Sequence, residues 1–399
     1  MDALSHYETG CNFLEKGDYD QAIFYFNKAI ELDERYAKAY MSRGIAYHRM
    51  GEYDVAIYDY KVALKIDQND AEVYCNRGMT YLNLGEMDQA ISDFNKAIEI
   101  NPGYAQAYIY RGNAYRVKEQ NEDQVISDYN KAVEIDPNNV EGYKARAFFY
   151  WLRDQLEEAI ADYTKLIEID PKNRDYYLRR ADIYEGKRQF DEAIADYNKL
   201  LKMFPNDYEL YKGRGAIFDK KGQLDEVIAD YTKALEINPT DGFLYEKRGK
   251  IFYEKGQFDE AIADYTKALE IYPDDASIYA KLASICQAYG QLDEAISYYN
   301  KLIDKEGNAG LYLSRGEIFY EKGQLDQAIA DYTKALETIY HSDGFLYLNS
   351  YGYYLRGVAY YKKQDYDKSW DDINKAQELG YSIPQEFIDQ LRTASKREK

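Results

Sequence analysis

The sequence predicts an all-α solenoid made of tandem helical hairpins. Three observations lead to this fold class: the 399 residues repeat with a period of 34, apolar residues recur within each repeat at helical spacing, and glycine and proline recur where helices would end. A hairpin of this kind carries an apolar face that only its neighbours bury, so the repeats must stack on one another.

The repeat is visible by direct comparison. GQLDEVIADYTKALEINP begins at Gly222, and GQFDEAIADYTKALEIYP begins 34 residues later at Gly256. The same frame gives eleven repeats, numbered one to eleven, whose residues occupy places one to thirty-four; it is interrupted by one added residue in repeat four, one missing from repeat nine and seven added at 343–349. The repeats span 3–36, 37–70, 71–104, 105–139, 140–173, 174–207, 208–241, 242–275, 276–308, 309–342 and 350–383.

The first helix of each repeat is predicted from places four, eight and eleven, which stand at i, i+4 and i+7 on one helix face. Place four is Tyr in ten repeats, place eight is Gly or Ala in all eleven, and place eleven is Tyr or Phe except at Cys286. Glycine at place fifteen in seven repeats is expected to end this helix.

The second helix is predicted from the apolar stripe at places twenty, twenty-one, twenty-four, twenty-seven and twenty-eight. Place twenty is small, place twenty-one is Ile in ten repeats, and place twenty-four is Tyr or Phe in ten. An aspartate two or three places after place fifteen is expected to cap this helix, and proline at place thirty-two to stop it. Small residues at places eight and twenty let the two helices approach closely, with aromatic rings filling the space around them.

This pattern resembles the tetratricopeptide repeat over residues 3–383, with eleven copies in register. The resemblance implies a right-handed superhelix whose first helices line a concave groove, with binding of other proteins or peptides as the usual role. Residues 384–399 are expected to form a polar capping helix and tail, with Ser382 and Gln385 at capping-box spacing.

Composition and motifs exclude several function classes. A net charge of −20 disfavours nucleic acid as the main partner, and no apolar run approaches the ~20 residues that would insert into a membrane. The start, MDALSHYETG, lacks a secretory pattern, and the scattered cysteines and histidines predict no metal site and suit a reducing, cytoplasmic setting. Without a phosphate-binding loop, a nucleophile elbow or a zinc-protease motif, we expect no cofactor and no enzymatic activity.

Two places vary together and predict a structural ladder. Arginine holds place seven and aspartate holds place twenty-three in the same nine repeats, whereas repeats one and nine lose both. We expect a bidentate salt bridge within each repeat; the alternative is an arginine ladder that grips an acidic ligand. The ladder includes the pairs Arg77 and Asp93, Arg111 and Asp128, Arg146 and Asp162, Arg214 and Asp230, and Arg248 and Asp264.

A second joint change occurs in repeats five, six and nine. These have Ala at place eight in place of Gly, and Leu at place twenty-seven in place of Ala. Because both exchanges add volume, neither is expected to compensate for the other, and we expect wider helix spacing and altered curvature there. The alternative is coincidence among eleven repeats.

The first candidate binding surface lies on the first helices of repeats three to five, at places that the resemblance implies to be exposed. Large apolar residues at exposed places indicate an interaction site, and two asparagines suit an extended peptide backbone. The alternative is that Phe148 and Trp151 pack against a neighbouring repeat. The candidates are Asn76, Met79, Tyr110, Asn113, Phe148 and Trp151, with Cys75 and Ile109 on the same predicted face.

The second candidate is a charged stretch of repeats seven to nine that includes Lys212, Lys247 and Lys250. It suits an acidic peptide, or else it is a solvated face of mixed charge. Chaperone-binding members of the family hold a peptide carboxylate with Lys and Asn at places five and nine. Here Lys212 is followed by Ala216, and Asn113 is preceded by Ile109, which argues against chaperone tails as ligands.

The third candidate is the seven-residue insertion, which is expected to start the last first helix early. It carries Phe345, Tyr347, Tyr351 and Tyr354, either as a self-association surface or as an aromatic cap. Together these features predict a non-catalytic scaffold that captures a protein or peptide. The alternatives are a self-associating building block and a regulatory subunit of an enzyme complex.

Overall fold

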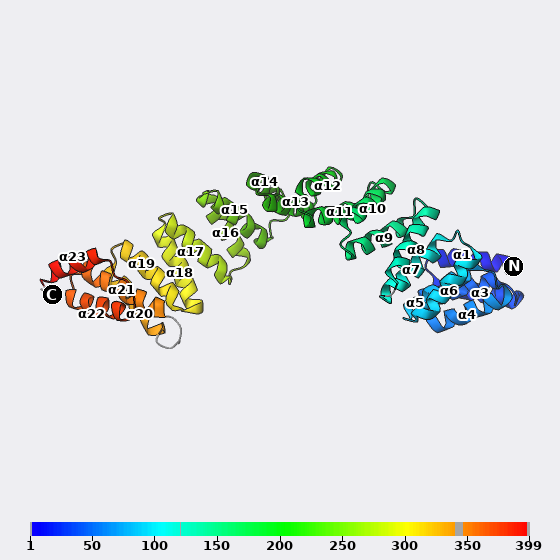
Figure 1. The fold of residues 1–399 in the computed structure, drawn as a ribbon, viewed down its shortest axis with the longest axis horizontal. Helices are drawn as coiled ribbons and strands as arrows, with labels where there is room; N and C mark the ends of the chain where they lie inside the picture. The colour runs from blue at the N-terminus through cyan, green and yellow to red at the C-terminus, as the bar shows by residue number, and fades with distance from the viewer. Residues whose placement is uncertain (1, 120, 340–345, 397–399) are drawn as a thin grey trace. The chain divides into compact units, whose positions relative to one another are not determined.

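The computed structural model describes residues 2–119, 121–339 and 346–396, and within them it contains helices and no strands. The helices follow one another as antiparallel pairs (Figure 1). They are α1 Ala3–Glu15, α2 Tyr19–Leu32, α3 Ala37–Arg49, α4 Tyr53–Ile66, α5 Ala71–Asn83, α6 Met87–Ile100, α7 Ala105–Val117, α8 Glu122–Ile135, α9 Val140–Leu152, α10 Leu156–Ile169, α11 Arg174–Gly186, α12 Phe190–Met203, α13 Tyr208–Lys221, α14 Leu224–Ile237, α15 Gly242–Glu254, α16 Phe258–Ile271, α17 Ala276–Ala288, α18 Leu292–Glu306, α19 Ala309–Glu321, α20 Leu325–Ile339, α21 Leu346–Lys362, α22 Tyr366–Glu378 and α23 Gln385–Ser395.

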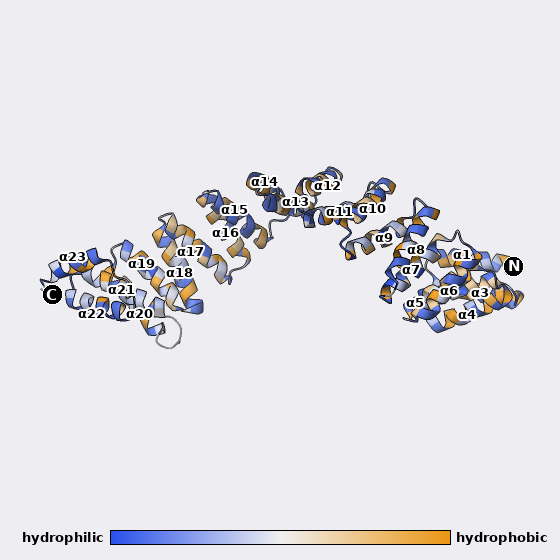
Figure 2. Ribbon diagram, viewed as in Figure 1, coloured by the Kyte–Doolittle hydropathy of each residue, from blue (hydrophilic) through white to orange (hydrophobic). Residues whose placement is uncertain are grey.

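The chain forms two compact units, Met1–Met203 and Phe204–Lys399. Inside each unit, a first helix packs against the second helix of its own repeat, and that second helix packs against the next first helix. Apolar and polar residues alternate along the helices instead of gathering in one stretch (Figure 2). The apolar stripes therefore meet between helices, as the spacing predicts.

The core of a repeat is the contact between place eight on the first helix and the ring at place twenty-four on the second. A Cβ atom added to Gly78 would lie 2.7 Å from the Phe94 ring, and one added to Gly44 would lie 2.8 Å from the Tyr60 ring. Both rings are fully buried. Glycine at place eight thus lets the ring lie directly on the backbone of the first helix.

Helix ends follow the predicted glycines but not the predicted aspartate caps. Gly17, Gly51 and five further glycines at place fifteen adopt a positive φ after the first helix. In repeat one the N-cap is Asp18, directly after Gly17. The aspartate expected to cap the second helix, two or three places after place fifteen, is instead the second helical residue, as at Asp20, Asp54 and Asp88, and the N-caps Glu52 and Glu86 make no side-chain cap bond. There its charge meets the positive end of the helix dipole.

The C-terminal helix α23 covers the end of the second unit. Its Ile388 and Leu391 are buried, and the Trp370 indole N–H of α22 donates to Ser395 Oγ at 3.1 Å. The expected capping box is wrong, because the N-cap is Pro384 and Gln385 is the first helical residue. The preceding pair starts early, as expected, since α21 begins at Leu346.

Candidate functional site

The arginines at place seven each bind an aspartate of the same repeat with a two-bond fork. Nε donates to Oδ2 and Nη2 donates to Oδ1, at 2.6 to 2.9 Å in all nine pairs. The aspartates are buried between the two helices. The pairs are Arg43–Asp59, Arg77–Asp93, Arg111–Asp128, Arg146–Asp162, Arg180–Asp196, Arg214–Asp230, Arg248–Asp264, Arg315–Asp331 and Arg356–Asp372.

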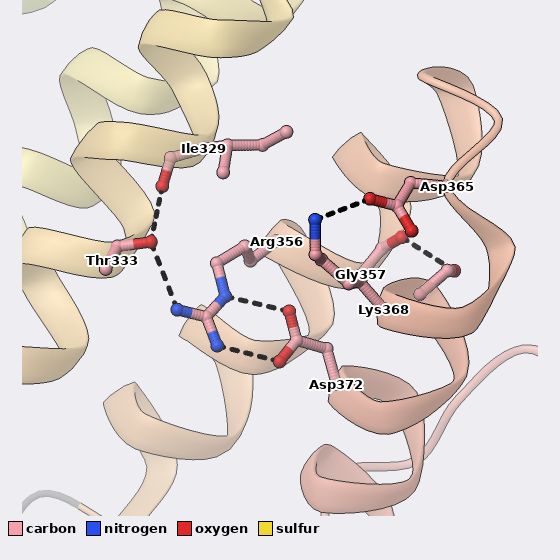
Figure 3. Close-up of polar contacts among 8 residues, drawn as sticks. Ile329, Thr333, Arg356, Gly357, Asp365, Lys368 and Asp372 are labelled. Carbon is pink, nitrogen blue, oxygen red and sulfur yellow. Dashed lines mark hydrogen bonds and ion pairs between the residues drawn. The ribbon is translucent and has the colours of Figure 1, made fainter.

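The same guanidinium also reaches the preceding repeat, which the sequence pattern did not suggest. Nη1 of Arg356 donates to Thr333 Oγ1 at 3.1 Å while its other two nitrogens hold Asp372 (Figure 3). Six further arginines donate in this way to Asn or Thr at place twenty-five, at 2.5 to 2.8 Å. The ladder therefore joins consecutive repeats as well as the two helices of one repeat.

The aspartates of the ladder are buried, and each arginine lies against an aromatic ring. Each guanidinium lies 5.3 to 5.9 Å from the centre of the Tyr ring at place four. Burial raises the pKa of the Asp162 carboxyl, against the pull of Arg146. The pKa of Arg146 is raised as well: burial opposes its charge, but the hydrogen bond to Asp162 prevails. With these N–H groups occupied, the ladder belongs to the helix contacts and does not offer an open grip for an acidic ligand.

An exposed aromatic stack stands on α9 in repeat five. Phe148 and Trp151 have 42% and 51% of their surface exposed, and their ring centres lie 5.9 Å apart at an interplanar angle of 28°. The Arg116 guanidinium of α7 lies 5.4 Å from the centre of the Phe148 ring. The structure thus leaves this stack on the surface, where a partner can reach it.

Other predicted groove residues are more enclosed. Tyr110 is half-buried with its ring 5.8 Å from Phe94, and the Asn113 side chain accepts a hydrogen bond from the Tyr129 hydroxyl at 2.7 Å. Asn76 and Met79 are also half-buried.

The expectation that Cys75 and Ile109 lie on the exposed face is wrong, because both are buried. Each belongs to a core cluster that includes residues of the adjoining repeat. Place five is therefore an inter-repeat contact in these two repeats.

Beside the aromatic stack lies a cavity of about 210 Å³. Phe148 and Trp151 come from α9, Tyr163 from α10, and Arg179, Asp182 and Ile183 from α11, so three consecutive helices of the first unit form it. Burial raises the pKa of the Asp182 carboxyl, an effect that the nearby Arg179 opposes. The cavity combines apolar walls with one positive and one negative side chain.

The lysines of repeats seven and eight lie next to neutralising partners. Lys212 binds Asp241 and Lys250 binds Glu254, both at 3.2 Å, while the Lys247 ammonium lies 5.0 Å from the centre of the Phe243 ring. Exposed pairs of this kind leave little net positive charge to attract an acidic peptide. The geometry matches a solvated face of mixed charge more closely than a clamp.

The aromatic residues near the insertion gather around one ring. Tyr351 and Tyr354 of α21 lie 5.8 and 4.8 Å from the Tyr381 ring, measured between ring centres, and Tyr347 is 70% exposed. Phe345 lies outside the described residues. Tyr351 and Tyr354 are thus in place to cap the end of the unit, and Tyr347 presents a surface.

Metal-binding clusters and membrane-spanning helices are both absent from the residues that the structure describes. Among residues 2–119, 121–339 and 346–396, no group of three or more His, Cys, Asp or Glu side chains is arranged to hold a metal ion. Across the same described ranges, no helix has the length and apolar character required to cross a membrane.

Comparison with known families assigns the chain. Family models described as "Tetratricopeptide repeat" match 71–104, 105–139, 141–173, 174–207, 208–241, 230–263, 288–344 and 313–380. Models described as "TPR repeat" match 10–51, 47–85 and 249–290. The chain is a tetratricopeptide repeat protein. Members of this family are in general protein-interaction scaffolds.

Solved structures resemble this tetratricopeptide repeat protein at low similarity. A structure of MamA is 28% identical, covering 41% of this chain and 95% of that one, with a TM-score of 0.36. A Pseudomonas aeruginosa pilF structure is 18% identical over 53% and 96%, with a TM-score of 0.45. The APC/C hetero-tetramer Cut9–Hcn1 is 17% identical over 98% and 90%, with a TM-score of 0.33. No curated protein matches the sequence.

Of the residues that line the cavity of this tetratricopeptide repeat protein, the sequence indicated Phe148 and Trp151 as binding residues and none of the others. Tyr163 was assigned to the core with every other ring at place twenty-four, and Arg179 and Asp182 were not singled out. The available signal was the joint exchange to Ala147 and Leu166 in repeat five, but the same exchange occurs in repeats six and nine, where the ring is buried.

Proposed function

We propose that this chain is a non-catalytic, cytoplasmic scaffold that takes up an extended segment of a partner protein on the first helices of repeats three to five. The exposed Phe148–Trp151 stack is the single observation that carries the proposal. Aromatic anchors contribute much of the energy of protein interfaces, and large apolar side chains exposed together mark such surfaces.

Neighbouring features support this surface over the charged one. Tyr110 and Asn113 lie on the adjacent first helix α7, and successive first helices α5, α7 and α9 contact one another. In repeats seven and eight, by contrast, Lys212 and Lys250 are paired with carboxylates. A partner that bound there would have to displace existing ion pairs.

The test is capture of partners by the immobilised full chain, read by mass spectrometry. Tyr110→Ala combined with Trp151→Ala is expected to abolish capture of the specific partners while keeping the far-ultraviolet circular dichroism. The control is Tyr58→Ala combined with Tyr272→Ala. Both rings are exposed and belong to second helices, Tyr58 within α4 and Tyr272 at the C-cap of α16. Unchanged capture by the first variant contradicts the proposal.

A second function, self-association through the C-terminal aromatic residues, is favoured by the 70% exposure of Tyr347. Light scattering across protein concentration tests it. A chain that stays monomeric at high concentration contradicts self-assembly as the main role. A mass that doubles with concentration, and returns to that of the monomer in Tyr347→Ser, supports it.

A further inference from the structure

The paired exchange in repeats five, six and nine has a steric cause. In six repeats with glycine at place eight, an added Cβ atom would lie 2.6 to 2.8 Å from the ring at place twenty-four. Real Cβ atoms do not approach a ring so closely. Ala147, Ala181 and Ala283 carry that Cβ atom, so the ring opposite each of them must lie elsewhere.

The burial of these rings follows the exchange. Opposite glycine, Phe26, Tyr60, Phe94 and Tyr129 have 0% of their surface exposed. Opposite alanine, Tyr197 and Tyr299 have 8% and 7% exposed, and Tyr163 is only half-buried.

Leucine at place twenty-seven takes up the space. Leu166, Leu200 and Leu302 are buried, and Leu302 shares a core cluster with Ala283 and Tyr299. The two helices of a repeat make their fewest close approaches in repeats five, six and nine, as the wider spacing expected there predicts, and the leucine lies in the core between them.

In repeat five the ring at place twenty-four meets apolar neighbours that form a cavity with it. Phe148 and Trp151 hold places nine and twelve there, and Ile183 of the next repeat completes the wall. In repeat nine the same places hold Ser284 and Gln287, and the Tyr299 hydroxyl donates to Gln287 Oε1 at 3.3 Å. The exchange thus produces a polar surface in repeat nine and an apolar cavity in repeat five.

The size of the cavity and its charges define what it can accept. About 210 Å³ is below the roughly 300–1,000 Å³ of small-molecule and cofactor sites, and suits one large side chain. The cavity wall holds one guanidinium, Arg179, and one carboxylate, Asp182; Arg116 lies over the Phe148 ring, and Asp175 and Glu185 act on Tyr163 and Asp182 from nearby. Arg179 makes no hydrogen bond or ion pair within the described part of the chain, so its fork is open to a carboxylate.

We propose that this cavity, the repeat-five pocket, binds one aromatic or branched apolar side chain of a partner peptide whose neighbouring acidic residue pairs with Arg179. The side chain lies against Phe148, Trp151 and the outward Tyr163. The proposal rests on the proposed function and names the chemistry of the partner segment.

The first test uses the pocket's own tryptophan. The chain has two tryptophans, and Trp370→Phe leaves Trp151 as the only indole reporter. The probes are three blocked tetrapeptides: acetyl-Gly-Phe-Asp-Gly-amide, the same peptide with Lys for Asp, and the same peptide with Ala for Phe. The Phe-Asp peptide is expected to change Trp151 emission at about tenfold lower concentration than either of the other two peptides. The difference from the Lys peptide reflects the loss of one ion pair, and the difference from the Ala peptide reflects the loss of one apolar side chain. Equal or undetectable responses to all three overturn the proposal.

The second test restores the common core pattern. Ala147→Gly with Leu166→Ala gives repeat five the residues that eight other repeats have, so Tyr163 can return to the helix contact and the pocket closes. Binding of the Phe-Asp peptide is expected to weaken about tenfold or more, with the circular dichroism retained. The matched control, Ala283→Gly with Leu302→Ala, makes the same change in repeat nine and is expected to leave binding unchanged. Equal binding by both variants overturns the proposal.

A surface variant keeps the proposal testable if the core variant unfolds. Arg179→Gln changes an exposed side chain and is expected to erase the preference for Asp over Lys while keeping the response to Phe. A preference that survives this change overturns the role of Arg179. If Tyr110→Ala with Trp151→Ala abolishes partner capture but the repeat-five core variant captures normally, the proposed function stands and the repeat-five pocket falls.

Discussion

Removal of one ladder arginine measures how strongly consecutive repeats are joined. Arg146 makes two hydrogen bonds to the buried carboxylate of Asp162, at 2.9 and 2.6 Å, and a third to Asn130 of the preceding repeat at 2.7 Å. Arg146→Ala leaves Asp162 buried and without its cation. Breaking a buried ion pair on one side costs about 3–5 kcal/mol, because the remaining charge is uncompensated. We expect this loss in urea unfolding followed by circular dichroism.

Arg77 provides a matched comparison within the same unit. Its fork to Asp93 has the same geometry, at 2.7 and 2.6 Å, but the residue at place twenty-five of the preceding repeat is Lys61, which cannot accept a hydrogen bond. Burial raises the pKa of Asp93, and the Lys61 charge opposes that rise. Arg77→Ala is expected to cost about 1.5–3 kcal/mol less than Arg146→Ala, the value of one hydrogen bond to a charged group.

The pH dependence and a charge-conserving control complete this experiment. Burial raises the folded-state pKa of Asp162 above its unfolded value, so protonation is favoured in the folded state. The loss in Arg146→Ala is therefore expected to be smaller at pH 5 than at pH 7, since lowering the pH removes the unpaired charge. Arg146→Lys keeps the charge without the fork and should give an intermediate loss. A loss below about 1 kcal/mol at pH 7, or a larger loss for Arg77→Ala, refutes a ladder that links repeats.

Three further predictions concern the core, a buried histidine and the C-terminal surface. Gly78→Ala should lower the free energy of unfolding in urea by about 1–3 kcal/mol, because the added Cβ atom would meet the Phe94 ring. Adding Ala97→Leu should restore part of this loss, and no recovery contradicts the idea that the leucine compensates for the alanine. Burial lowers the pKa of His48, so its contribution to stability is fully present above pH ~6.5 and falls as the pH drops below that value. In His48→Gln the melting temperature should change less between pH 7.5 and pH 5.5 than in the unmodified protein, and an equal change contradicts this. Tyr347→Ser should leave the melting temperature within about 2 °C, as expected for an exposed side chain, and a large fall would show that Tyr347 contributes to the cap.

The candidate site was only partly accessible from the sequence. The resemblance to the family implied that Phe148 and Trp151 lie on the exposed face of a helix, and both are exposed. The same resemblance implied that Cys75 and Ile109 lie there, yet both are buried by residues of the adjoining repeat. Periodicity within one helix tells which residues share a face, whereas the burial of that face depends on side chains from a neighbouring repeat.

The ladder shows the same limit. Joint loss of arginine and aspartate in two repeats predicted the pairing within a repeat, since two residues that vary together and have opposite charge suit one contact. The third hydrogen bond, from Arg146 to Asn130, could not be predicted in this way, because Asn, Thr and Lys all occur at place twenty-five. Whether that bond forms depends on the distance between successive repeats.

The sequence by itself determined the fold class, the two helices of each repeat and the glycines that end first helices, because helix periodicity and terminating glycines act over a few residues of chain. Tertiary structure alone decided that Tyr163 turns outward and forms a pocket with Trp151 and Ile183. The Tyr163 ring and the Ala147 Cβ atom belong to different helices and cannot occupy the same space. Only the packing of the two helices shows where the ring lies.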